Sequence, residues 1–127
     1  MNKMNLAAKK CTPCQGGVLP MLYDVAKNYL NETPGWSLTD DATKLKRTFK
    51  FDNFEDAMRL AQRVGEFCEK EGHHPDLTFG WGFCKVEFQT HKINGLHEND
   101  FIMAAKVNRL AESVSNNTPN TKFRTTH

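Results

Sequence analysis

The sequence predicts an α+β domain, a four-stranded antiparallel sheet covered on one face by helices, in the order α-β-β-α-β-β-α. Three features of the sequence support this prediction. Two pairs of short segments carry apolar residues at every second position, a turn signal separates the members of each pair, and segments with helical spacing flank the pairs. A chain of 127 residues is long enough for one such domain with a single core.

We place this domain at residues 19–114. Residues 1–18 form a leader that we expect to be partly flexible, and residues 115–127 form a tail that we expect to be flexible because its polar, Asn- and Thr-rich sequence offers nothing periodic to bury. The domain opens with a short helix, because Pro20 suits a first helical turn. The apolar residues spaced for one face of this helix are Leu22, Val25, Ala26, Tyr29 and Leu30.

A first hairpin and the longest helix come next. The hairpin is predicted by apolar residues with period two on both sides of the turn DDAT: Trp36, Leu38, Leu45, Phe49 and Phe51. Asp52 and Glu55 are placed as a capping pair at the start of the helix, and Lys70 and Gly72 are typical of its end. The residues expected on its buried stripe are Phe54, Ala57, Met58, Ala61, Val64 and Cys68.

A second hairpin and a final helix complete the predicted order. Trp81 and Gly82 predict a two-residue turn, and the strands on either side of it then pair Phe79 with Cys84 and Leu77 with Val86. The final helix carries Asp100 near its positive end. Its apolar stripe consists of Met103, Val107, Leu110 and Val114.

Composition and charge exclude several classes of protein. The formal net charge of +2 sets up no strong field, so nothing demands a nucleic-acid partner. No apolar run approaches the roughly 18 to 20 residues that a membrane helix needs, and the apolar stretch at the start of the sequence is too short for a secretory signal. We therefore expect a cytoplasmic protein without a membrane partner, whose 4 cysteines remain thiols.

The candidate functional residues lie at the ends of the predicted elements. His73 and His74 follow the Gly stop of the long helix, His91 ends the last strand, and Asp100 begins the last helix. Taken singly, each has a simpler interpretation: a histidine after a helix can bond the last carbonyls, and a first-turn aspartate complements the helix dipole. Two adjacent imidazoles weaken that interpretation, and imidazole is the side chain that exchanges protons near neutral pH.

A metal site and a nucleophilic site are less well supported. The motif CTPC, at Cys11 and Cys14, has the spacing of half a zinc site, but Cys68 and Cys84 do not form a second pair. A redox role for CTPC lacks the surrounding βαβ order, and no Ser or Cys lies in a recognisable nucleophile motif. We expect no bound metal.

The order and spacing of these residues resemble the signature of the pterin-4a-carbinolamine dehydratase family, which includes the dimerisation cofactor of a homeodomain transcription factor in animals. The matching positions are Glu69, His73, His74, Pro75, Trp81, His91 and Asp100. The resemblance extends from CTPCQGG, which is common in bacterial members, to GLHENDFIMAAKV. The sequence departs from the family at His97, where relatives usually have Ser or Thr to cap the final helix, so we expect a poorer cap there and no effect on catalysis.

The resemblance implies a carbon-oxygen lyase. Its substrate would be 4a-hydroxytetrahydropterin, or pterin-4a-carbinolamine, which loses water to give quinonoid dihydropterin and so supports recycling of the tetrahydropterin used by aromatic amino acid hydroxylases. The pterin is the substrate, and no separate cofactor is implied. The resemblance also implies a homodimer or homotetramer and a functional link to phenylalanine hydroxylase or a related hydroxylase.

The resemblance assigns catalytic roles to His73, His74, His91 and Asp100. We expect His73 and His91 to exchange protons, His74 to bind the pterin and assist at its N5, and Asp100 to orient an imidazole or stabilise its charge. The spacing does not say which histidine is the acid and which is the base. The substrate-binding residues that we expect are Glu69, His74, Pro75, Trp81 and Thr90.

The family also contains proteins that bind a transcription factor, so a coactivator without turnover is the alternative function. The exposed positions of the long helix that we identify are charged: Arg59, Arg63 and Glu66. Because these positions offer no apolar surface to a partner, the enzyme is the favoured function.

Overall fold

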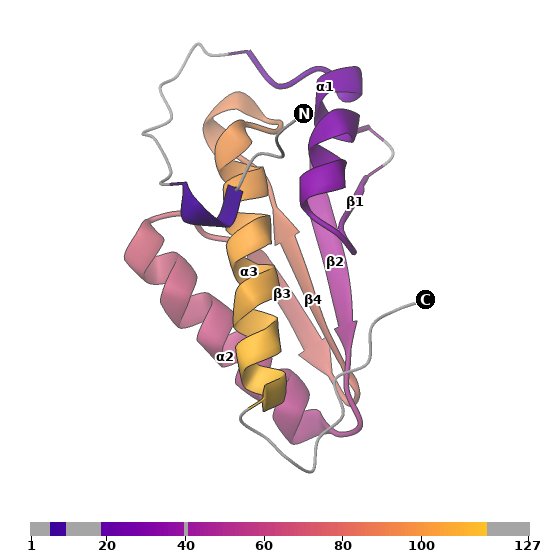
Figure 1. Cartoon of the computed structure of the whole chain (residues 1–127), viewed down its shortest axis with the longest axis vertical. Coiled ribbons are helices and arrows are strands. Elements are labelled where there is room, and N and C mark those ends of the chain that lie inside the picture. The colour runs from indigo at the N-terminus through magenta and orange to yellow at the C-terminus, as the bar shows by residue number, and fades with distance from the viewer. Residues whose placement is uncertain (1–5, 10–18, 40, 117–127) are drawn as a thin grey trace.

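In the computed structural model, which describes residues 6–9, 19–39 and 41–116, helices lie on one face of a four-stranded antiparallel sheet (Figure 1). The predicted fold class and element order are confirmed. The strands are β1 (Ser37–Leu38), β2 (Leu45–Lys50), β3 (Asp76–Gly80) and β4 (Phe83–Phe88). The α-helices are α1 (Tyr23–Tyr29), α2 (Phe54–Glu71) and α3 (Glu98–Asn116), and the 3-10 turns are η1 (Leu6–Ala8), η2 (Leu30–Glu32) and η3 (His91–Ile93).

The strand order β1-β2-β4-β3 joins the two predicted hairpins through their second strands. The pairs Leu77 with Val86 and Phe79 with Cys84 form as predicted. The turn between β3 and β4 contains Gly82 with a φ of 83°, the left-handed region that glycine adopts without strain. The central strands β2 and β4 are therefore paired on both sides, whereas β1 and β3 form the edges of the sheet.

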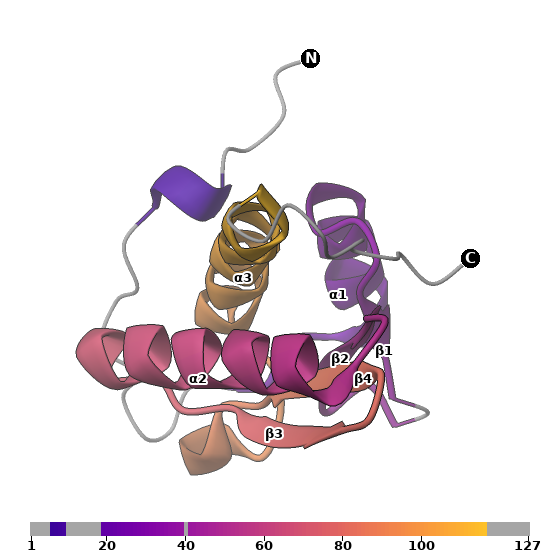
Figure 2. The ribbon, with the colours of Figure 1, turned by 90° about the horizontal axis from the view of Figure 1, so that it is seen from below.

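The core lies between the sheet and the helices. Alternate side chains of β2 and β4 point toward the helices and are buried, including Phe49, Val86 and Phe88. Helix α2 packs on β3 and β4, while α3 crosses over β2 and β4, so that both helices are seen on the same side of the sheet in Figure 2. None of the described helices has the length and apolar character to cross a membrane.

The start of α2 differs from the prediction by one residue. Asn53, not Asp52, is the N-cap: its side chain accepts from the Asp56 backbone N–H at 2.8 Å and donates to the Asp56 carboxylate at 2.9 Å. Asn caps a helix as well as Asp does, so the sequence did not distinguish the two positions. The predicted burial of Phe54 and Met58 is also wrong, because these side chains are 45% and 42% exposed.

The N-terminal segments pack only in part as predicted. Leu22, which precedes α1, and Val25 within it are exposed, and only Ala26 of α1 is fully buried. The Tyr29 ring packs on Phe101 with centroids 5.0 Å apart. Within the predicted leader, Leu6 is buried in the core, where η1 contacts α3. Helix α3 continues two residues into the predicted tail. The expected flexibility of residues 10–18 and 117–127 concerns positions outside the described residues.

Candidate active site

The end of α2 fixes the backbone of the first histidine. Gly72 adopts the left-handed conformation, with φ 69° and ψ 25°. Its N–H donates to the Glu69 carbonyl, and the N–H of His73 donates to the Cys68 carbonyl, each at 3.2 Å. These two bonds form a Schellman motif, which ends the helix and sets the direction in which the chain leaves it. The predicted Gly stop therefore places His73 as well as ending α2.

The side chain of Asp100 is the centre of the site. It lies in the first turn of α3, is fully buried, and accepts three hydrogen bonds from protein groups. Oδ1 lies 2.8 Å from Nε2 of His73, while Oδ2 accepts from the Thr90 hydroxyl at 2.8 Å and from the His97 backbone N–H at 3.0 Å. A buried carboxylate is tolerated only with such partners, and here they come from three separate segments.

The Asp100 carboxylate determines which nitrogen of His73 carries a proton. An ionised carboxylate can only accept, so Nε2 of His73 must donate to it. Neutral His73 then has no proton on Nδ1, which is the nitrogen left to accept one. The ring is held in place because it also packs on Phe88 with centroids 5.8 Å apart, and the side chain is 14% exposed. His73 is thus an oriented imidazole that can exchange a proton through one known atom.

The second histidine faces a different environment. His74 Nε2 lies 2.8 Å from Oε1 of Glu69, which is in the last turn of α2. The two side chains are 64% and 78% exposed, so solvent screens this pair and it adds little to stability. Pro75 follows and is half-buried. The adjacent imidazoles therefore diverge: His73 is directed inward to a buried carboxylate, and His74 lies on the surface.

The structure brings some predicted site residues together and separates one. His91 is exposed and directly follows Thr90, whose hydroxyl is bonded to Asp100, so it lies at the same end of β4 as the Asp100 cluster. Trp81 is 73% exposed in the turn at the other end of the β3–β4 hairpin. The length of β3, roughly 14 Å of strand, separates that turn from the histidines of the same chain.

His97 bonds to the backbone at the start of the final helix, a contact that the sequence pattern did not predict. Its Nδ1 accepts from the Asn99 backbone N–H at 3.1 Å, which is the bond that a serine or threonine cap would make. Its own backbone N–H is one of the three donors to Asp100. The spacing of His97 and Asp100, with the acid at the third helical position, is the sequence signal for the bond from Asp100 back to the cap.

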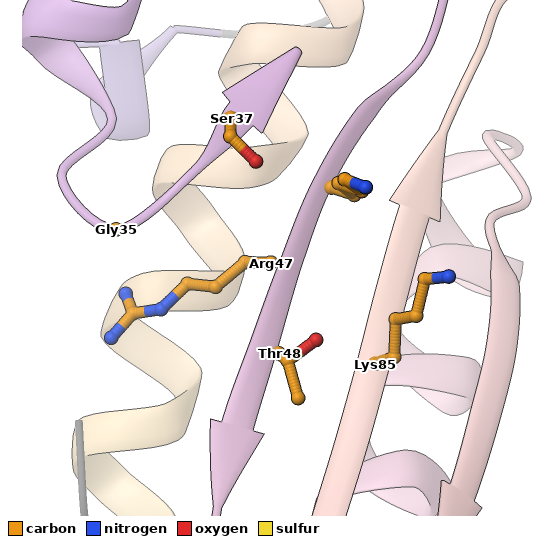
Figure 3. A pocket seen from close by; sticks show the side chains of 6 residues that line it. Gly35, Ser37, Arg47, Thr48 and Lys85 are labelled. Atoms are coloured by element: carbon orange, nitrogen blue, oxygen red, sulfur yellow. The ribbon is translucent and has the colours of Figure 1, made fainter. Parts of the chain in front are cut away.

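A hollow of about 270 Å³ lies elsewhere on the sheet (Figure 3). In Figure 3 the Arg47 side chain extends toward α3, where its Nη1 donates to Asn108 Oδ1 at 2.6 Å. None of the residues around the hollow belongs to the Asp100 cluster. The cluster pairs a buried carboxylate with an imidazole, and no such pair lines the hollow. The lining residues of the hollow are Gly35, Ser37, Lys46, Arg47, Thr48 and Lys85.

The thiols and possible metal ligands of the described residues do not form a second site. Cys68 and Cys84 are buried thiols outside any disulfide. Burial raises the pKa of Cys84 to about 12, so its thiol stays protonated at neutral pH and is a poor nucleophile. No group of three or more His, Cys, Asp and Glu residues suited to a metal ion occurs within 6–9, 19–39 and 41–116. The cysteines of CTPC lie outside these ranges.

Comparisons with known proteins agree on one family. The family model described as pterin 4 alpha carbinolamine dehydratase matches residues 21–110. A Methylococcus capsulatus protein named "Putative pterin-4-alpha-carbinolamine dehydratase" is 63% identical over 111 residues, which are 87% of this chain and 97% of the relative. An Aromatoleum aromaticum protein with the same name is 55% identical over 106 residues, covering 84% of this chain and 95% of the relative. A crystal structure of a transcriptional coactivator/pterin dehydratase from Brucella melitensis has a TM-score of 0.67 at 29% identity and covers 72% of this chain and 98% of its own.

Removal of the Asp100 carboxylate should destabilise the fold strongly. Asp100→Ala leaves the Thr90 hydroxyl and the His97 N–H without their acceptor, and we expect the free energy of unfolding to fall by about 3 kcal/mol or more. Glu69→Ala, which breaks the exposed bond to His74, is the control. It should change the free energy of unfolding by less than about 0.5 kcal/mol. Urea unfolding followed by circular dichroism measures both, and equal losses would contradict the central position of Asp100.

Proposed function

The chain belongs to the pterin 4 alpha carbinolamine dehydratase family, and from this membership and the His73–Asp100 pair we propose that the protein dehydrates 4a-hydroxytetrahydropterin. The bond between a buried carboxylate and a half-buried imidazole is the observation that supports a proton-transfer reaction best. A carboxylate paired with histidine orients the ring and stabilises its protonated form.

The proposed reaction breaks one bond to oxygen and transfers two protons. The C4a–O bond breaks as the hydroxyl leaves, and a proton delivered to that hydroxyl makes it water. The lone pair of N5 forms a double bond to C4a, and N5 loses its own proton. The products are quinonoid dihydropterin and water, with no change in oxidation state, so one general acid and one general base are sufficient.

We assign the proton transfers to His73 and His91. His73 would use Nδ1, the nitrogen that faces away from Asp100, and the carboxylate would stabilise the imidazolium that forms. His74 and Glu69, which are exposed beside it, would bind the edge of the pterin, with His74 assisting at N5.

The other three residues predicted to contact the substrate lie at different distances from the two histidines along the fold. Pro75 directly follows the two histidines and remains a candidate contact. Thr90 would act through Asp100, to which its hydroxyl is bonded. Trp81 lies at the far end of the hairpin, so we assign it no contact with the pterin of the same chain.

The proposed reaction needs no metal and no cofactor besides its pterin substrate. Its product would be reduced again to the tetrahydropterin that phenylalanine hydroxylase or another aromatic amino acid hydroxylase uses, which links the protein functionally to such an enzyme. We place the reaction in the cytoplasm, where reducing conditions keep thiols such as Cys68 and Cys84 free.

We propose that the protein assembles as a homodimer or homotetramer. Strand β3 is an edge strand, and such edges are available for pairing with another chain. Apolar side chains gather near this edge, since the rings of Phe54 and Phe79 lie 5.7 Å apart and both are at least 40% exposed. Exposed apolar groups of this kind are typical of protein interfaces.

A coactivator without turnover is the second candidate, and two observations favour it. The Brucella melitensis relative is described as both coactivator and dehydratase. The exposed side chains of Phe54 and Met58 also give α2 an apolar surface beside its charged positions, of which Arg59 lies 3.8 Å from carboxylate oxygens of both Glu55 and Asp56. Capture of a regulatory protein without any dehydration would favour this candidate.

Dehydration of a chemically prepared carbinolamine tests the proposed function directly. Purified protein, dialysed against a chelator, should accelerate the loss of the 4a-hydroxyl in proportion to its concentration, because imidazoles supply the required proton transfers. Absorbance during rapid mixing measures the rate. Activity that disappears on dialysis and returns only with zinc would contradict the metal-free mechanism, and no acceleration at all would contradict the dehydratase.

The two adjacent histidines should affect different kinetic constants. His73→Ala should lower kcat with little change in KM, whereas His74→Ala should raise KM more. General acid-base assistance is worth about 10²- to 10⁴-fold, and loss of one of two imidazoles that can replace each other should fall at the low end. The double variant His73→Ala/His91→Ala should lose more than either single variant. Near wild-type kcat in the folded double variant would refute the assignment.

A further inference from the structure

Helix α3 is capped by a histidine in an arrangement that usually involves serine or threonine. The Asn99 backbone N–H donates to Nδ1 of His97 at 3.1 Å, and the His97 backbone N–H donates to Oδ2 of Asp100 at 3.0 Å. The Asp100 backbone N–H closes the turn by donating to the His97 carbonyl at 2.9 Å. The bond from the third helical position back to the cap matches half of a capping box, whereas the cap side chain accepts from the second helical position, Asn99.

We propose that His97 is a positioning residue for the dehydration reaction, and that it positions Asp100 only while its imidazole is neutral. This inference rests on the proposed function. Oδ2 of Asp100 accepts from His97 and Thr90, while Oδ1 faces His73. The bonds to Oδ2 therefore set the rotation of the carboxylate, and that rotation sets the ring of His73. Fraying of the first turn of α3 would turn the carboxylate away from His73.

The cap depends on the protonation state of the imidazole. Nδ1 can accept the Asn99 N–H only when it carries no proton, so His97 must be neutral with its proton on Nε2. Protonation removes the acceptor and adds a positive charge at the positive end of α3, where it is unfavourable. A serine or threonine cap does not titrate, whereas imidazole changes charge between about pH 5 and pH 8. The cap of this chain should therefore weaken as the pH falls.

The charged groups around His97 do not replace the lost bond. Glu98 accepts from Lys9 of η1 at 2.9 Å and from the Tyr29 hydroxyl of α1 at 3.1 Å, and the hydrogen bond from Lys9 holds the pKa of Glu98 below its usual range. Glu98 follows His97 in the chain, and Asp100 accepts from the His97 backbone N–H. Both carboxylates already have other donors.

On the remaining neighbouring segments, His73 follows α2 and is bonded to Asp100, and His91 and Lys92 of η3 are exposed to solvent. His73 is thus committed to Asp100, and the other two side chains are committed to solvent. Protonated His97 therefore leaves the first turn of α3 without its side-chain cap.

Amide hydrogen exchange tests the cap without reference to activity. In His97→Ala the Asn99 amide should exchange roughly two- to thirtyfold faster than in the wild type, which is the factor expected for loss of a side-chain cap, and His97→Ser should restore slow exchange. Exchange at Asn99 that is unchanged in His97→Ala would overturn the proposal. This measurement does not require turnover. A protein that shows the expected exchange but no dehydration would refute the proposed function and leave the cap supported.

The pH profile of dehydration tests the positioning role. His97→Ser keeps the cap and removes the titration, so the ratio of its kcat to the wild-type kcat should rise as the pH is lowered from about 8 to about 5, with little change in KM. Asn53→Ala removes the comparable cap of α2 and controls for a general loss of stability; its ratio to the wild type should be independent of pH. A ratio for His97→Ser that is also independent of pH would overturn the positioning role.

Discussion

The buried carboxylate of Asp100 is the interaction on which the rest of the site depends. It joins the residue that follows α2, the segment that follows β4 and the first turn of α3, through His73, Thr90 and His97. Removing a carboxylate from water costs several kcal/mol unless its oxygens are hydrogen-bonded, so the packing of these three segments offsets the cost of burying Asp100. The same bonds orient the imidazole. The Asp100 carboxylate therefore contributes both to the stability of the domain and to the geometry of the site.

The different environments of the two adjacent histidines follow from the way in which α2 ends. The Schellman motif at Gly72 sets the direction of the chain, after which consecutive side chains diverge. His73 meets the Asp100 carboxylate and the Phe88 ring, and His74 remains in solvent beside Glu69. One imidazole is thus held against a buried carboxylate, and the other lies exposed beside Glu69. A single helix end provides both.

Local features of the fold could be predicted from the sequence, whereas features set by tertiary packing could not. The pairing of Leu77 with Val86 follows from turn chemistry and strand alternation, which are local. The exposure of Phe54 depends on how α2 is rotated against the sheet, and apolar spacing alone does not determine that rotation. For the site, the identity of Asp100 was predictable, but its bonds to Thr90 and His97 form only when distant segments meet. The sequence signature gives the order and spacing of its residues along the chain. It does not give their distances in space, so it could not show that Trp81 lies far from the histidines of the same chain.

The most direct test of the Asp100–His73 interaction is the tautomer of His73 in the folded protein. Nitrogen-15 NMR of the ring, recorded near pH 8 and assigned by comparison with His73→Ala, distinguishes a protonated from an unprotonated ring nitrogen. We expect Nε2 to carry the proton, because it must donate to the carboxylate, and Nδ1 to be free. Neutral His73 with its proton mainly on Nδ1 would show that Asp100 does not orient the ring, and would contradict the mechanism built on this pair.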